Sequence, residues 1–111
     1  MQLNDRINIQ KFINETDDEG FNKESWNDYY NCWARFKTVG WKEYYSAKAI
    51  QAENTVTFTI RYSPKIKAML DDPSVTKKYR VVYKNKNYDI KYINDLDNKH
   101  EYVDIKAEII T

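Results

Sequence analysis

The sequence has few of the residues from which catalytic and metal sites are built. Cys32 is the single cysteine and His100 the single histidine among 111 residues. One cysteine excludes an internal disulfide and a zinc cluster of several thiolates. One histidine, with no second cysteine, leaves little from which to build a nucleophile–base pair. We therefore expect no enzyme activity, no metal site and no cofactor.

Glycine and proline are also scarce, with two of each in the chain. Gly20 and Gly40 stand too far apart to form a phosphate-binding glycine loop. Low-complexity disorder is excluded as well, because 41% of the residues are hydrophobic and 15% are aromatic. A chain of this length can enclose one apolar core, so we expect a single domain over residues 1–111.

Long apolar runs and an excess of charge are missing too. The first residues lack the apolar core of a signal peptide, and no segment is long enough to span a membrane. We therefore expect the protein to be made in the cytoplasm and to stay off membranes. Lysine and arginine number 18 against 17 acidic residues, and the two signs are mixed along the chain. Proteins that bind duplex DNA tightly show an excess or a stripe of basic residues. The near-equal numbers of basic and acidic residues here therefore favour protein partners.

Alternating apolar and polar residues dominate what is present, and they predict a mainly β fold. The clearest strand is expected over residues 54–62, where Val56, Phe58 and Ile60 face a core. The threonines between them face solvent or a shared surface. Further strands are expected over residues 6–13, 26–39, 78–83, 87–93 and 100–110. About six strands with short turns predict a small closed or nearly closed antiparallel barrel.

Four segments interrupt the strand pattern. Residues 14–25 are acidic and rich in turn formers, which predicts a solvated loop. Ser63 before Pro64 predicts a capped short helix over residues 64–70. Lys84 and Asn85 begin a polar stretch that predicts a tight hairpin turn. Apolar residues at helical spacing from Trp41 to Gln51 predict a short amphipathic helix or a long loop.

The second expected strand carries aromatic residues on both faces. Tyr30, Cys32 and Phe36 alternate on the inner face, so Cys32 is interpreted as a packing thiol rather than a reactive one. Trp33 faces outward, where a large exposed ring is costly unless something covers it. Trp33 is therefore a candidate interface residue. His100, at the start of the last strand, is interpreted as a solvated side chain.

Three stretches of the sequence resemble the phage head–tail joining proteins, also called head–tail adaptor, stopper or head completion proteins. They are LNDRINIQ at residues 3–10, GWKEYYSAKAIQAENTVTFTIRY at 40–62 and YRVVYKNKNYDIKYINDLDNKHEYVDI at 79–105. Together they cover nearly the whole chain in the family's order. Two departures stand out, because residues 84–86 replace an Asn-Gly turn and residues 63–76 form a longer segment than usual.

The resemblance implies a small β-barrel that assembles into a ring, a dodecamer in the family, within the head–tail connector of the virion. The ring would lie beneath the portal and adaptor, close the DNA-filled head and offer a surface to tail components. A long loop would project toward the central channel and touch packaged double-stranded DNA transiently. This loop corresponds to Gly40, Trp41, Lys42, Glu43, Tyr44, Tyr45, Lys48 and Glu53. The resemblance does not distinguish a stopper ring from a neighbouring adaptor ring.

Two alternatives stay open from the sequence. Trp41, Tyr44 and Tyr45 are expected either to pack between subunits, as aromatic anchors do, or to pack on their own barrel. A second function is a nucleic-acid-binding module, in which single-stranded bases stack on Trp33 and neighbouring tyrosines. Binding of a labelled oligonucleotide that weakens with salt would distinguish this module from a connector subunit.

Overall fold

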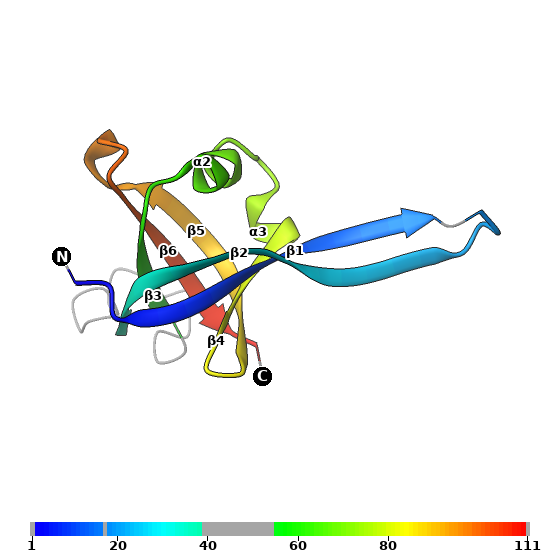
Figure 1. Cartoon of the computed structure of the whole chain (residues 1–111), viewed down its shortest axis with the longest axis horizontal. Coiled ribbons are helices and arrows are strands. Elements are labelled where there is room, and N and C mark those ends of the chain that lie inside the picture. Colours follow the sequence, from blue (N-terminus) through cyan, green and yellow to red (C-terminus); the bar gives the residue numbers. More distant parts are fainter. Residues whose placement is uncertain (1, 17, 39–54, 111) are drawn as a thin grey trace.

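Six antiparallel strands form one sheet that closes on itself in the computed structural model, which describes residues 2–16, 18–38 and 55–110. The order around the barrel is β1-β2-β3-β6-β5-β4, and β4 pairs back onto β1 (Figure 1). The expected mainly β fold with about six strands is therefore confirmed. The strands are β1 (Asp5–Thr16), β2 (Asn22–Thr38), β3 (Thr55–Arg61), β4 (Tyr79–Tyr83), β5 (Lys86–Asp95) and β6 (Tyr102–Ile109).

The barrel interior is filled by the inward rows that the alternation predicts. The ring of Phe58 lies at the centre, with its centroid 5.5 Å from that of Tyr83 and 5.4 Å from that of Tyr88. Ile7 and Ile9 from β1 and Ile105 from β6 are fully buried around this cluster. Burying these side chains supplies the main driving force for closing the barrel.

The outer threonine row of β3 is also buried, which the alternation alone does not predict. Thr55, Thr57 and Thr59 are each less than a tenth exposed. Thr59 donates its hydroxyl hydrogen bond to Asp104 on β6. Long side chains of β2 and β6, among them Arg35, border the same shallow groove as Thr57 and Thr59. The threonines therefore lie beneath longer polar side chains. The hydrogen bond to Asp104 spares the buried Thr59 hydroxyl the free-energy cost of having no partner.

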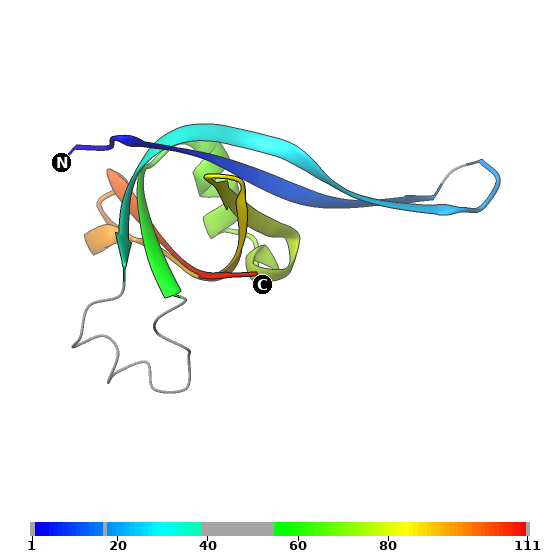
Figure 2. The same cartoon turned by 90° about the horizontal axis from the view of Figure 1, so that it is seen from below.

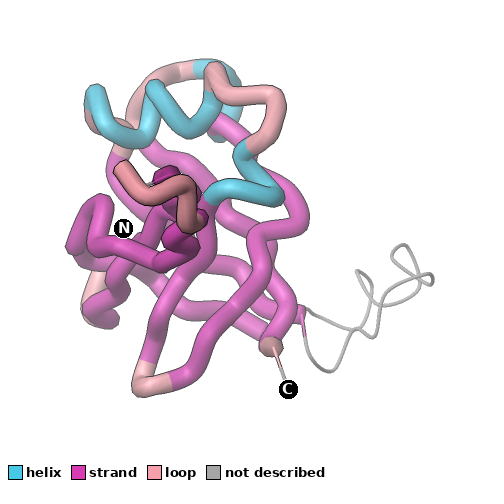
Figure 3. Tube along the Cα trace, turned by 90° about the vertical axis from the view of Figure 1, so that its right-hand side faces the viewer, coloured by secondary structure: helices cyan, strands magenta, loops and turns pink. Residues whose placement is uncertain are grey.

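Short helices gather on one side of the barrel (Figure 3). They are α2 (Pro64–Leu70), α3 (Val75–Lys78) and the 3₁₀ helix η2 (Leu96–Asn98). The expected helix over residues 64–70 is confirmed as α2, and the Ser63 hydroxyl caps it by accepting from the backbone N–H of Ile66 at 3.3 Å. Helix α3 was not expected, and it delays the start of β4 to Tyr79.

The polar turn between β4 and β5 is as tight as the sequence predicts. Lys84 and Asn85 both have positive φ, at 49° and 63°. Two consecutive left-handed residues match the right-handed twist of the flanking strands, which explains the position of an asparagine there.

The prediction of a solvated loop over residues 14–25 is wrong for residues 14–16 and 22–25, which are strands, although the described residues of this range are exposed as expected and residues 18–20 form a turn. Strands β1 and β2 continue as a paired ladder from Asp5↔Ala34 to Thr16↔Asn22. Beyond Lys11, which pairs with Tyr79 of β4, this hairpin leaves the barrel as an arm of residues 12–16 and 18–26 (Figure 2). The arm accounts for the elongated shape, with extents of 52 × 29 × 26 Å. Polar residues form strands here because both faces of the arm meet solvent, so no apolar alternation is required.

A bulge marks the place where the arm meets the barrel. The register between β1 and β2 shifts at Ile9 and Gln10, and this shift leaves Tyr29 as the extra residue of β2. The bulge turns Tyr29 toward α2, where its hydroxyl donates to the Lys65 carbonyl at 2.7 Å. Its ring also meets Tyr79 edge-on at 5.1 Å. Strict alternation along β2 would place Tyr29 on the outer face with Trp33, and the bulge explains why Tyr29 packs against the core instead.

Candidate functional site

The segment that the sequence singles out most strongly lies outside the described residues. Gly40, Trp41, Lys42, Glu43, Tyr44, Tyr45, Lys48 and Glu53 all belong to it, as does the predicted helix from Trp41 to Gln51. Its two anchors are described, because Thr38 at the end of β2 pairs with Val56 in β3. The segment therefore connects neighbouring strands and leaves and re-enters the barrel at the same end.

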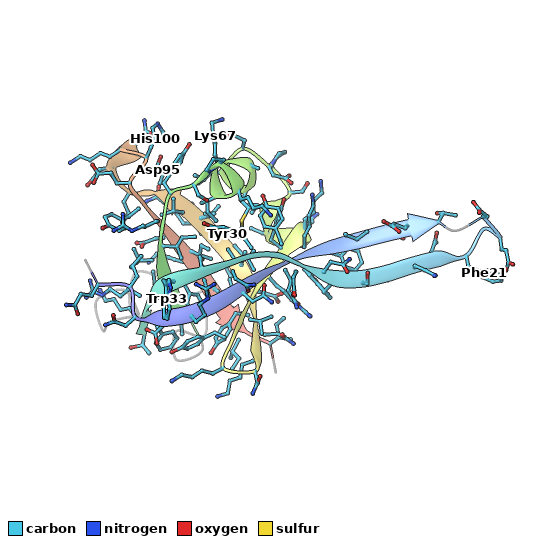
Figure 4. All side chains as sticks on the ribbon, viewed as in Figure 1. Phe21, Tyr30, Trp33, Lys67, Asp95 and His100 are labelled. Carbon is cyan, nitrogen blue, oxygen red and sulfur yellow. The ribbon has the colours of Figure 1, made fainter. Side chains whose placement is uncertain are left out.

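Trp33 lies on the outer surface, as its place in the alternation predicts. Its side chain is 53% exposed, and the guanidinium carbon of Arg6 sits 5.2 Å from its ring centroid. Arg6, Trp33 and Arg61 border an open groove of about 410 Å³, which we call the Trp33 groove. Figure 4 shows Trp33 on the barrel at the end away from the arm.

The Trp33 groove exists because β3 leaves the edge of β2. The two strands pair only from Ala34↔Ile60 to Thr38↔Val56, and β3 ends at Arg61. The chain then turns away toward α2. Residues 30–33 of β2 consequently lose their β3 neighbour, and their side chains line the groove. A cationic, partly aromatic groove of this kind suits an acidic or aromatic binding partner.

Cys32 also lines the Trp33 groove, but its thiol is chemically quiet. Burial raises the pKa of Cys32 to about 11, and the nearby charge of Arg6 opposes this shift in part. A thiol with such a pKa is protonated at neutral pH, and the thiolate is the nucleophilic form. The structure therefore supports the interpretation of Cys32 as a packing residue.

His100 has a partner, although its side chain is largely exposed as expected. The Nδ1 atom of His100 contacts Oδ2 of Asp95, and its backbone N–H donates to Oδ1 of the same carboxylate at 3.0 Å. The His100 ring lies 4.9 Å from the ring of Tyr62. Asp97 and His100 both have positive φ, which marks a sharp turn between β5 and β6. The Asp95 carboxylate stabilises this turn through its hydrogen bond with the His100 backbone. Across residues 2–16, 18–38 and 55–110 no group of His, Cys, Asp and Glu could hold a metal.

The family model of the phage head completion proteins matches residues 1–110. The chain belongs to the phage head completion protein family. The resemblance drawn from the sequence is thus confirmed. Head completion proteins are structural rather than enzymatic, and membership makes this chain a structural protein of the phage head, located in the virion. No helix in the described part of the chain is long and apolar enough to cross a membrane.

Solved structures show the same fold as this head completion protein. Protein SF1141 from Shigella flexneri 2a is 24% identical, with a TM-score of 0.73, and the match covers 96% of this chain and 92% of that one. A chain in the virion of the native gene transfer agent particle is 16% identical, with a TM-score of 0.59, covering 99% of this chain and 97% of that one. No curated protein matches the sequence.

Sequence reasoning missed the arm as a feature of this head completion protein. Its base is held by Trp26, whose ring lies 5.3 Å from that of Phe12 and 4.4 Å from the guanidinium of Arg80. Its tip carries Phe21, which is 65% exposed, at the far end of the long axis from Trp33 (Figure 4). The spacing of Phe12 and Trp26 about a turn at Gly20 is the signal that could have revealed a hairpin.

Proposed function

We propose that this protein is a ring-forming subunit of the head–tail connector. The ring lies beneath the portal and adaptor, closes the DNA-filled head and presents the surface to which tail components attach. The observation that carries the proposal is the head completion family match over residues 1–110, on a barrel that is closed by the pairing of β4 with β1. In a closed barrel the strands pair with one another rather than with other chains. Contacts with neighbouring subunits are therefore left to the segments that extend from the barrel.

The segment between β2 and β3 is the proposed channel element of this ring. It carries Lys42, Glu43, Lys48 and Glu53, a balanced mixture of charges. A channel element must touch duplex DNA during packaging without holding it. Mixed charge meets this requirement, because strong binding to phosphates needs an uncompensated set of lysines and arginines.

Omitting the protein during phage assembly tests the proposal. Heads should then contain the portal and package DNA, but they should lose DNA or fail to accept tails. DNA retention is measured by nuclease protection of purified heads, and tail joining by negative-stain counting of complete particles. Supplying the purified chain to such heads should restore joining. Heads that retain DNA and join tails normally without the protein would contradict the proposal.

A further inference from the structure

We infer that the arm tip of one subunit docks in the Trp33 groove of the next copy in the ring. The inference rests on the proposed ring and assigns the surfaces that build it. Three observations support it: the two surfaces have opposite charge, each presents an exposed aromatic ring, and they lie at opposite ends of the molecule.

Charge complementarity is the first of these observations. The described tip of the arm exposes Glu15, Asp18, Glu19 and Glu24 against Lys23. The Trp33 groove carries Arg6 and Arg61, and none of the described residues that line it is acidic. Patches of opposite sign steer association and fix the register of an interface, whereas like charges repel wrong partners.

Aromatic residues give both surfaces an anchor. Phe21 is 65% exposed at the tip, and Trp33 is 53% exposed beside the groove. Large exposed rings of this kind are costly on a free surface and dominate the binding energy when they become buried between proteins. The groove of about 410 Å³ is large enough to take an aromatic side chain with its neighbours.

The positions of the two surfaces make a second copy the fitting occupant. The arm extends away from the barrel along the long axis, and the Trp33 groove lies toward the other end (Figures 1 and 4). One molecule with extents of 52 × 29 × 26 Å therefore cannot fill its own groove with its own straight arm. Contact between two different patches of identical chains is head-to-tail, and head-to-tail contacts generate rings when the rotation closes.

Cysteine cross-linking in assembled particles tests the contact directly. The test variant Lys23→Cys/Asn31→Cys/Cys32→Ala places one thiol on the exposed tip and one beside the groove. The control variant Lys23→Cys/Lys86→Cys/Cys32→Ala moves the second thiol to the exposed end of the β4–β5 turn. Oxidation should give the test variant a ladder of dimers, trimers and larger species on a non-reducing gel, and the control none. A test variant present in particles but without a ladder would overturn the inference.

A charge swap provides the second arm of the test. Arg6→Glu/Arg61→Glu should reduce incorporation into particles by at least about tenfold, because like charges then meet. Adding Asp18→Lys/Glu24→Lys to the same chain should restore incorporation, and Lys84→Glu/Lys86→Glu at the β4–β5 turn should have no effect. Circular dichroism verifies that each variant folds. Loss without restoration would overturn the contact with the arm.

Two further outcomes distinguish this contact from a failure of the proposed ring and from a groove that binds nucleic acid. If the wild-type chain is absent from purified particles, the proposed function fails, and the inference fails with it. If the chain is present, a labelled single-stranded oligonucleotide tests the groove for another occupant. Binding at low salt that Arg6→Glu/Arg61→Glu abolishes, and that Asp18→Lys/Glu24→Lys does not change, would assign the groove to nucleic acid and overturn the inference.

Discussion

At the scale of the residue, a single carboxylate joins three strands of the barrel. Asp5 on β1 accepts a hydrogen bond from the Tyr83 hydroxyl at 2.8 Å and another from the backbone N–H of Phe36 at 3.3 Å. The Tyr83 ring stacks on Phe36, with centroids 5.0 Å apart. Because β1 and β4 are far apart in sequence and their pairing closes the barrel, this contact helps to fix the closure.

Tyr83→Phe should lower the free energy of unfolding by about 1–2 kcal/mol, because it removes a hydrogen bond to a charged group and keeps the ring. Urea unfolding followed by tryptophan fluorescence measures the change. Tyr92→Phe is the matched control, since Tyr92 is 55% exposed and its substitution should leave the free energy of unfolding within about 0.5 kcal/mol of wild type.

The effect of Tyr83→Phe on the free energy of unfolding should depend on pH in the alkaline range. Burial, with the hydrogen bond to Asp5, raises the pKa of Tyr83 from its ordinary value of 10.0 to about 12. The folded state therefore favours the neutral phenol of Tyr83. The contribution of this phenol to the free energy of unfolding is complete below the pKa of the unfolded state, and it is lost as the pH rises through the pKa of the folded state. The stability difference between wild type and Tyr83→Phe should be constant below pH 10 and shrink toward pH 12. A difference that stays constant to pH 12 would contradict this account.

At the scale of the element, the cap of α2 offers a comparison within the chain. Ser63 caps α2 through its hydroxyl, whereas Ser74 at the start of α3 makes no such hydrogen bond. Ser63→Ala should therefore cost about 1 kcal/mol of stability. Ser74→Ala should cost clearly less, and thermal unfolding of both variants measures the difference. Equal losses would show that the Ser63 hydroxyl does not stabilise α2.

The arm should loosen independently of the barrel. Trp26→Ala removes the contacts with Phe12 and Arg80 that hold the base of the arm. An isolated two-stranded hairpin is marginally stable, so amides of residues 12–16 and 22–26 should exchange with solvent faster while those of β3 and β6 do not change. Hydrogen exchange with mass spectrometry measures this, and Trp33→Ala serves as the control. Unchanged exchange in the arm would show that Trp26 does not anchor it.

The sequence predicts a strand when one face of that strand is buried, because burial of one face requires apolar and polar residues to alternate. Strand β3 and helix α2 were predictable, because Val56, Phe58 and Ile60 alternate and Ser63 marks the helix start. The arm was not, since neither of its faces enters the core and its polar residues carry the composition of a loop. The bulge at Tyr29 depends on pairing between distant strands, so local periodicity contains no signal of it.

The candidate site was also predictable only in part. Trp33 was singled out because an outward ring in an alternating strand is unusual, and the structure places it at the surface. The groove beside it was not predictable, because it brings Arg6 and Arg61 together from strands that are far apart in sequence. The role of residues 40–53 stays a prediction from the sequence.

At the scale of the whole molecule, we propose a separate task for each part of the chain in the connector. A closed barrel carries the β2–β3 connection at one end and an arm along its long axis, and the family match covers residues 1–110. These parts have separate proposed tasks: the connection faces the channel, and the arm reaches the next subunit. We propose that the chain forms the closing ring of the connector.

A reconstruction of the head–tail connector by cryo-electron microscopy tests this claim most directly. We predict a ring of barrels beneath the portal and adaptor, with residues 39–54 directed toward the central channel and each arm lying against the next subunit. Finding the chain as an isolated copy, on the outer surface of the head, or outside the particle would contradict it.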